Sequence, residues 1–253
     1  MKTITFVYPS NTAVISVTGK SCELNCRHCM AKYLEHMDSI DNFNKNTESI
    51  LLSGGYDKNG SVPITEEHLK QLKNYKLNIH PGLVDESQAK LLARYAHSIS
   101  FDFPAGEDVI RGVYGLNKTM NDYIKAYKLL KIHCKNVIPH ICIGLGGNEL
   151  KAVNLLAHIG FDELVLLGLM PNEYFKNPPS IERLINIIKK LRQLYPGKKL
   201  SLGCMRPAGN YRKELDTKAL EHVDKIVMPH KDAVELAKKK RFKIINKHEC
   251  CVI

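Results

Sequence analysis

The stretch from residue 13 to residue 29 reads Ala13-Val14-Ile15-Ser16-Val17-Thr18-Gly19-Lys20-Ser21-Cys22-Glu23-Leu24-Asn25-Cys26-Arg27-His28-Cys29. Its first five residues predict a strand, and the strand runs into a loop that holds three cysteines with the spacing C-x3-C-x2-C. Thiolates are the usual ligands of iron–sulfur clusters, and a cluster of four irons needs four ligands. Three thiolates on one short loop can hold three irons and leave the fourth open to a small molecule. The alternative is structural zinc, which favours C-x2-C pairs and four protein ligands.

Short β-branched runs alternate with helical patterns along the whole chain, which is typical of a parallel sheet covered by helices. The predicted strands are Ala13–Val17, Ile50–Ser53, Leu77–His80, Ile99–Phe103, Val137–Ile143, Glu163–Leu169, Leu200–Cys204 and Lys225–Val227. The predicted helices are Thr65–Tyr75, Glu86–His97, Thr119–Ile132, Glu149–Ile159, Ile181–Tyr195, Asp216–Val223 and Lys231–Lys240, with one more after the cysteine loop. Eight strands and eight helices in 253 residues predict a complete (β/α)8 barrel of the TIM type in a single α/β domain.

The barrel is predicted to occupy residues 13–240. Residues 1–12 form an N-terminal extension that can add a short strand outside the barrel, and residues 241–253 form a C-terminal tail over the barrel mouth. Active sites of such barrels lie at the carboxyl ends of the strands. Because the cysteine loop directly follows the first strand, strand order and motif place the chemistry at the same end.

The composition predicts a cytoplasmic protein. Hydrophobic residues make up 44% of the chain and charged residues 25%, ordinary values for a globular protein. No uninterrupted apolar run is long enough to cross a bilayer, and the start lacks the apolar stretch of a signal peptide. Eight cysteines, three of them in one loop, do not resemble a secreted disulfide framework.

The net charge of +11 favours acidic partners, which include acidic proteins and nucleic acids. The alternative is a solvated lysine-rich surface, since the lysines are spread over most predicted helices. The sequence has no RNA-recognition signature and no basic strip with interleaved aromatic residues. Nucleic acid is therefore not expected as a partner.

Glycine and polar residues occupy several of the predicted strand ends. The second strand runs into Ser53-Gly54-Gly55, where glycine lets a ligand approach the backbone, although such a pair is more often a simple turn. The fourth carries Asp102, which faces inward if its aromatic neighbours face the helices; its partner is then either a ribose or a salt-bridging cation. The fifth strand leads into Gly144-Leu145-Gly146, and its His140 and Cys142 share one face, either lining the barrel axis or packed as buried residues.

A second group of cysteines lies far from the loop in sequence. Cys204 follows the seventh strand, on the same predicted face as Arg206, and Cys250 and Cys251 lie in the tail. If the tail folds back over the barrel mouth, these three cysteines predict an auxiliary iron–sulfur cluster. The alternatives are reactive thiols and ordinary tail residues.

At these residues the chain resembles the radical S-adenosylmethionine superfamily, in which the amino group and carboxylate of S-adenosylmethionine chelate the open iron. The resemblance implies that Cys22, Cys26 and Cys29 are the catalytic ligands of a [4Fe-4S] cluster. It implies cofactor contacts for His28, Ser53, Gly54, Gly55, Asp102, Gly144 and Gly146. Tyr56 stands where the family usually has an acid, so backbone contacts would have to bind the amino group of the cofactor.

The strand count resembles the biotin synthase branch of that superfamily, and within it the archaeal proteins that include subunits of a two-component lipoyl synthase. Arg206 is placed similarly to an arginine near the auxiliary cluster of biotin synthase. The chain departs from the pattern of auxiliary cysteines in biotin synthases, and it lacks the N-terminal C-x4-C-x5-C of bacterial lipoyl synthases.

The resemblance implies reductive cleavage of S-adenosylmethionine to methionine and a 5′-deoxyadenosyl radical, which takes hydrogen from an unactivated C–H bond. Sulfur insertion, octanoyl to lipoyl, would add the auxiliary cluster, an acidic lipoyl carrier protein and a second synthase subunit. An electron donor such as ferredoxin or flavodoxin is also implied. Two other functions stay open: a one-cluster radical enzyme that rearranges, methylates or couples a small molecule, and a non-catalytic zinc or iron–sulfur binding module.

Overall fold

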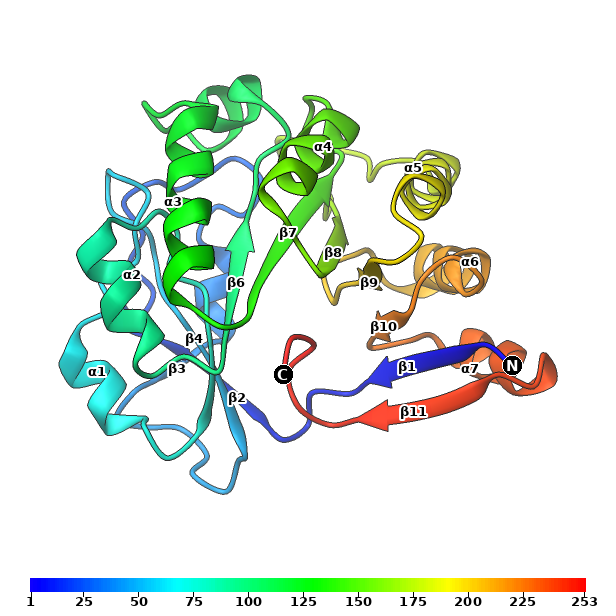
Figure 1. Ribbon diagram of the computed structural model, residues 1–253, viewed down its shortest axis with the longest axis horizontal. Coiled ribbons are helices and arrows are strands. Elements are labelled where there is room, and N and C mark those ends of the chain that lie inside the picture. Colours follow the sequence, from blue (N-terminus) through cyan, green and yellow to red (C-terminus); the bar gives the residue numbers. More distant parts are fainter.

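Eleven strands form one parallel sheet in the computed structural model, which describes residues 1–253 (Figure 1). The strands are β1 Thr3–Val7, β2 Thr12–Ser16, β3 Asp38–Ser39, β4 Ser49–Ser53, β5 Lys76–Ile79, β6 Ser98–Asp102, β7 Val137–Ile143, β8 Glu163–Gly168, β9 Lys199–Leu202, β10 Lys225–Val227 and β11 Lys243–Lys247. Their order across the sheet is β11-β1-β10-β9-β8-β7-β6-β5-β4-β2-β3. Every neighbouring pair is parallel.

Seven α-helices connect most of these strands and cover the outer face of the curved sheet (Figure 1). They are α1 Glu66–Gln71, α2 Glu86–Ala93, α3 Met120–His133, α4 Glu149–Ile159, α5 Ile181–Leu194, α6 Gly209–Ala219 and α7 Lys231–Lys239. The start of α1 follows the sequence signal, because the Thr65 hydroxyl accepts a hydrogen bond from the His68 backbone N–H. No helix is both long enough and apolar enough to span a membrane.

Alternation along the strands separates a helix-facing side from a hollow side. In β6, Ile99 and Phe101 belong to the main hydrophobic core, whereas Asp102 lines the cavity inside the curved sheet. In β7, Ile141 belongs to the core and His140 lines the cavity. The apolar side thus stabilises the fold, and the other side lines the cavity.

The sheet does not close into the predicted complete (β/α)8 barrel. It is an open half-barrel that curls through 258°. The strands expected to close the barrel, β2 and β10, do not pair, because β1 pairs with β10 and β11 pairs with β1. Residues 1–12 therefore contribute β1 to the sheet itself, with Thr5 opposite Lys225, rather than a strand outside a barrel.

The helix predicted after the cysteine loop is also missing. A 3-10 helix, Lys32–His36, stands in its place and is followed by the two-residue strand β3. Met30 and Ala31 have left-handed backbone angles, with φ of 50° and 56°. Such angles do not occur inside a right-handed helix, so the chain turns before a longer helix can form.

The C-terminal tail does not lie over the carboxyl ends of the strands, where it was predicted. Residues 243–247 form β11, and the His248 carbonyl accepts a hydrogen bond from the Asn11 N–H, one residue before β2 begins. The tail thus leaves the sheet at the amino end of β2. It then contacts the first residues of two other strands, since Glu249 pairs with Lys76 and the Cys251 carbonyl accepts a hydrogen bond from Lys225.

Candidate functional site

The cysteine loop lies at one cavity of about 460 Å³ inside the half-barrel, and all three of its cysteines line that cavity. The sulfur atoms of Cys26 and Cys29 lie within 4.8 Å of each other and of a ring nitrogen of His28. The Cys22 sulfur lies 3.9 Å from the Tyr56 carbonyl oxygen. The backbone N–H of Cys29 donates to the carbonyl of Cys26, which keeps the second half of the loop tightly turned.

Hydrogen bonding between two of the thiols makes one of them a better metal ligand. It lowers the pKa of Cys29 to about 7, while the same bond, together with burial, raises the pKa of Cys26. A thiolate is the form that binds metal, so the loop holds a sulfur close to its ligating state. His28 adds a buried Nδ1 atom that has no hydrogen-bond partner.

The Ser53-Gly54-Gly55 segment lines the cavity and lies against the cysteine loop. A Cβ atom on Gly55 would lie 1.9 Å from the Ser21 carbonyl oxygen and 2.6 Å from the Cys22 Cα atom. The Gly55 N–H donates to the Thr18 hydroxyl over 2.7 Å. Glycine at this position therefore serves a close approach by the protein's own loop.

His80, Asp102 and His140 form a continuous polar row on the cavity wall. His80 directly follows β5, Asp102 is the last residue of β6 and His140 lies in β7. These three strands are neighbours, and Asp102 stands opposite His140 in the register. The His80 Nδ1 atom lies 4.0 Å from an Asp102 carboxylate oxygen, and the two imidazole centroids are 5.4 Å apart. Burial lowers the pKa of both histidines to about 4, so both rings are neutral near neutral pH.

Gly144 and Gly146 do not belong to the cavity lining. Gly144 packs against Pro179 and Leu169, and its N–H donates to the Glu149 carboxylate over 3.2 Å. Both glycines have positive φ, 105° and 97°, which serves the turn from β7 into α4. The structure does not bring them together with the cysteine loop.

Cys204, Cys250 and Cys251 line the same cavity as the loop. Their sulfur atoms do not form a group within 4.8 Å, as Cys26, His28 and Cys29 do. The Asn78 side-chain N–H donates to the Cys250 sulfur over 3.1 Å, and hydrogen bonding with Cys251 lowers the pKa of Cys250 to about 7. The tail cysteines thus form a polarised pair of thiols on the wall of the cavity.

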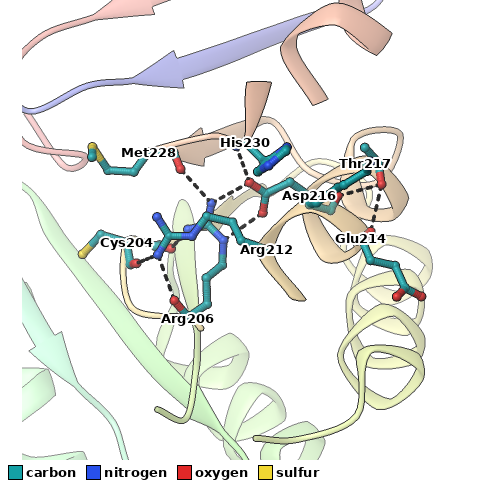
Figure 2. A network of polar contacts seen from close by, with 10 residues as sticks. Cys204, Arg206, Arg212, Glu214, Asp216, Thr217, Met228 and His230 are labelled. Carbon is teal, nitrogen blue, oxygen red and sulfur yellow. Dashed lines mark hydrogen bonds and ion pairs between the residues drawn. The ribbon is translucent and has the colours of Figure 1, made fainter. Parts of the chain in front are cut away.

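The sequence predicted that Arg206 and Cys204 share one face of the seventh strand. This prediction is wrong, because Cys204 lines the cavity and Arg206 does not. Figure 2 shows it turned toward α6, where its guanidinium donates to both carboxylate oxygens of Asp216, over 2.8 and 2.9 Å. Because β9 ends at Leu202, strand alternation does not extend to residues 204 and 206. Arg206 is fully buried and takes no part in the cavity lining.

His80, Tyr114 and Tyr123 are among the residues of the cavity wall that the sequence analysis missed. His80 directly follows β5, so the attention to strand ends that found Asp102 could have found it. Tyr114 follows a short π-helix, Val109–Val113, and Tyr123 lies on α3. No pattern in the sequence marks either tyrosine as facing a cavity.

The sequence matches no protein-family model and no curated protein. Among solved structures, SuiB from Streptococcus suis is similar to 85% of this chain, with a TM-score of 0.60 at 13% identity, over 52% of SuiB. SuiB bound to S-adenosylmethionine is similar to 94% of the chain, with a TM-score of 0.58 at 12% identity, over 58% of SuiB. The chain thus spans little more than half the length of SuiB.

The HMG-CoA lyase from Brucella melitensis is similar to 96% of this chain and over 93% of its own length, with a TM-score of 0.57 at 9% identity. At these identities the likeness shows a shared fold. One such fold occurs in a protein that binds S-adenosylmethionine and in a lyase. The fold alone therefore does not determine the reaction. The function has to be inferred from the side chains that line the cavity.

Proposed function

We propose that the protein is a radical S-adenosylmethionine enzyme, with Cys22, Cys26 and Cys29 holding a [4Fe-4S] cluster. The observation that carries the proposal is that the three thiols of one short loop line a single cavity at the carboxyl end of β2. The likeness of the fold to SuiB bound to S-adenosylmethionine supports it. When bound and reduced, the cluster supplies the electron that cleaves the sulfonium of S-adenosylmethionine.

The residues of the loop suit such a cluster. Three thiols are one ligand short of the four that a cubane needs, which leaves room for the cofactor. The buried Nδ1 atom of His28 has no partner in the protein, and a ring nitrogen of His28 lies within 4.8 Å of the sulfur atoms of Cys26 and Cys29, so this ring can contact a bound cofactor. Ser53, Gly54 and Asp102 line the same cavity and offer a hydroxyl, a backbone and a carboxylate to the cofactor.

The protein's own contribution is to position a substrate and keep water from the reacting atoms. Apolar residues such as Val14, Leu51, Val165 and Leu167 line the cavity together with the polar row. Apolar residues of this kind exclude water and so protect a reactive carbon radical from side reactions with solvent. Hydrogen abstraction from an unactivated C–H bond is the reaction that such a cavity suits.

The finer proposal is sulfur insertion, octanoyl to lipoyl, with Cys204, Cys250 and Cys251 as ligands of an auxiliary cluster. Its support is that these three cysteines line the same cavity as the first three. An electron donor such as ferredoxin or flavodoxin, a second synthase subunit and an acidic lipoyl carrier would be its partners. The one-cluster alternative, in which a small molecule is rearranged, methylated or coupled, needs none of the three cysteines.

Anaerobic reconstitution with iron and sulfide is expected to load the chain with about four irons if it holds one cubane, and about eight if the auxiliary cluster is present. After addition of dithionite and S-adenosylmethionine, the wild-type protein is expected to form methionine and 5′-deoxyadenosine. Cys26→Ala serves as the blank, because it removes one of the ligands. Wild-type protein that binds iron but forms no 5′-deoxyadenosine would contradict the proposed enzyme.

A single zinc ion is the second candidate, and one observation favours it. A ring nitrogen of His28 lies within 4.8 Å of the sulfur atoms of Cys26 and Cys29, and Cys22 lies in the same loop. Three thiolates and one imidazole make a complete structural zinc site. This arrangement would give a non-catalytic metal-binding module.

Replacing His28 with alanine separates the two candidates. If the loop holds an iron–sulfur cluster, His28→Ala is expected to keep its iron and sulfide content, because the three thiolates remain. If it holds zinc, the variant is expected to lose about 10- to 100-fold or more in zinc affinity, since a ligand is gone. Metal analysis of protein purified anaerobically, before and after reconstitution, gives the answer, with His158→Ala as a control at an exposed histidine of α4 outside the cavity lining.

A further inference from the structure

The cavity lining is free of cationic side chains, although the protein as a whole is strongly basic. The chain has 37 lysine and arginine residues, and none of them lines the cavity. Asp102 is the one carboxylate residue in the lining. An anionic molecule in this cavity would find no counter-charge from the protein and would meet the Asp102 carboxylate.

The wall does offer hydrogen-bonding groups that the protein leaves unused. His140 is only 4% exposed, and its Nδ1 atom lies 3.1 Å from the Ile138 carbonyl oxygen, so its Nε2 atom is left to accept a bond from another molecule. Tyr56, Tyr114 and Tyr123 line the cavity too, and a tyrosine hydroxyl can donate or accept a hydrogen bond. The Nδ1 atom of His28, another lining residue, is buried and has no partner in the protein; since buried polar groups are normally paired, it points to a ligand.

We infer that the cavity selects a substrate with an apolar body and no negative charge, whose polar end hydrogen-bonds with the row formed by His80, Asp102 and His140. The inference rests on the proposed function and adds the class of substrate. Substrates with a net negative charge, such as fatty acids and phosphate esters, are excluded from the cavity. Amides, alcohols and amines are admitted.

The exclusion follows from the energy of burying charge. An isolated carboxylate moved from water into an apolar site loses a solvation energy that only a counter-charge or several hydrogen bonds can replace. The Asp102 carboxylate, whose side chain is 42% exposed, adds repulsion between like charges. A neutral amide, in contrast, can donate an N–H to the His140 Nε2 atom or to Asp102 and accept a tyrosine O–H.

S-adenosylmethionine itself obeys the same rule, because its sulfonium and ammonium groups outweigh its single carboxylate. The lack of lysine and arginine in the lining therefore does not exclude the cofactor. It restricts the second molecule, for which the cavity wall offers hydrogen bonds without any positive charge. Asp102 then faces a cationic cofactor and a substrate without negative charge.

Three probes with one eight-carbon chain test the inference: octanamide, octylamine and octanoate. Their dissociation constants are measured by calorimetry on the reconstituted protein with S-adenosylmethionine present and no reductant. Octanamide is expected to bind at least about tenfold more tightly than octanoate, a difference of about 1.4 kcal/mol. Equal affinities of these two, or tighter binding of octanoate, would overturn the inference, and so would the failure of octanamide to bind.

Asp102→Asn tests the origin of the selectivity, because it removes the carboxylate and keeps the shape. The preference for octanamide over octanoate is expected to fall severalfold, while Asp41→Asn in an exposed loop leaves it unchanged. No reductant is present, so the binding result stands apart from the cleavage of S-adenosylmethionine. If octanamide binds selectively but no 5′-deoxyadenosine forms when reductant is added, only the proposed function is wrong. If S-adenosylmethionine is cleaved but octanamide and octanoate bind equally, only the inference about the substrate is wrong.

Discussion

Replacing Asp216 with alanine is expected to lower the free energy of unfolding by about 3–5 kcal/mol, because it leaves a buried guanidinium unpaired. Arg206 and Asp216 are both fully buried, and the carboxylate accepts two guanidinium N–H groups (Figure 2). The same carboxylate accepts the His230 N–H over 2.8 Å at the start of α7. One substitution therefore breaks the link between the end of β9, α6 and α7.

Denaturant unfolding under anaerobic conditions, followed by circular dichroism, measures this loss. Glu214→Ala is the matched control, because Glu214 lies on the same helix and its 2.6 Å ion pair with Lys218 is half exposed. Exposed pairs of this spacing contribute about 0.3–0.5 kcal/mol. If both variants lost the same small amount, the buried pair would not hold the two helices as described.

The same pair shows why part of the site could not be predicted from the sequence. The segment around Cys204 and Arg206 reads like the end of a strand, and the assumed alternation placed both side chains on one face. In the structure β9 ends at Leu202, and the buried carboxylate of Asp216 turns Arg206 away from the cavity. A partner on the following helix, ten residues further along the chain, decided the outcome, and strand periodicity carries no information about it.

The elements of the fold were largely predictable, and its closure was not. Short apolar and β-branched runs located eight of the strands, β2 and β4 to β10, because one face of each must pack against helices, whereas the two-residue strand β3 was not predicted. Closure of the sheet into a barrel depends on whether its first and last strands pair with each other. β1 occupies the position beside β10, and β11 extends that edge, through pairings that no local pattern encodes.

The site divides in the same way. The place of the cysteine loop at the cavity was predictable because three cysteines lie within eight residues directly after a strand, and that of Asp102 because it lies at a strand end. His80 and His140 become neighbours only because β5, β6 and β7 lie side by side. The tail cysteines approach the cavity from the amino end of β2, because the chain passes that end after β11. No pattern in the sequence indicates from which end of the strands the tail approaches.

Replacing Gly55 with alanine is expected to displace the cysteine loop and to reduce the formation of 5′-deoxyadenosine about a hundredfold or more. The new Cβ atom would lie 1.9 Å from the Ser21 carbonyl oxygen and 2.6 Å from the Cys22 Cα atom. Both neighbours are backbone atoms, so the loop itself must move. A misplacement of about 1 Å in a catalytic group can cost about a hundredfold in rate. The loss is expected in iron and sulfide content as well, because Cys22 is a proposed ligand.

Two alanine variants make this result specific to the loop. In Gly197→Ala the added Cβ atom has no neighbour within 4 Å, and cluster loading and cleavage are expected to match the wild type. In Gly54→Ala the nearest atoms are side chains at 3.1 Å, which can shift, so an intermediate loss is expected. Unfolding is measured alongside to separate a displaced loop from an unfolded protein. A folded Gly55→Ala variant with wild-type iron, sulfide and 5′-deoxyadenosine would show that the position of Cys22 does not control the cluster, and the proposed set of three ligands would then be wrong.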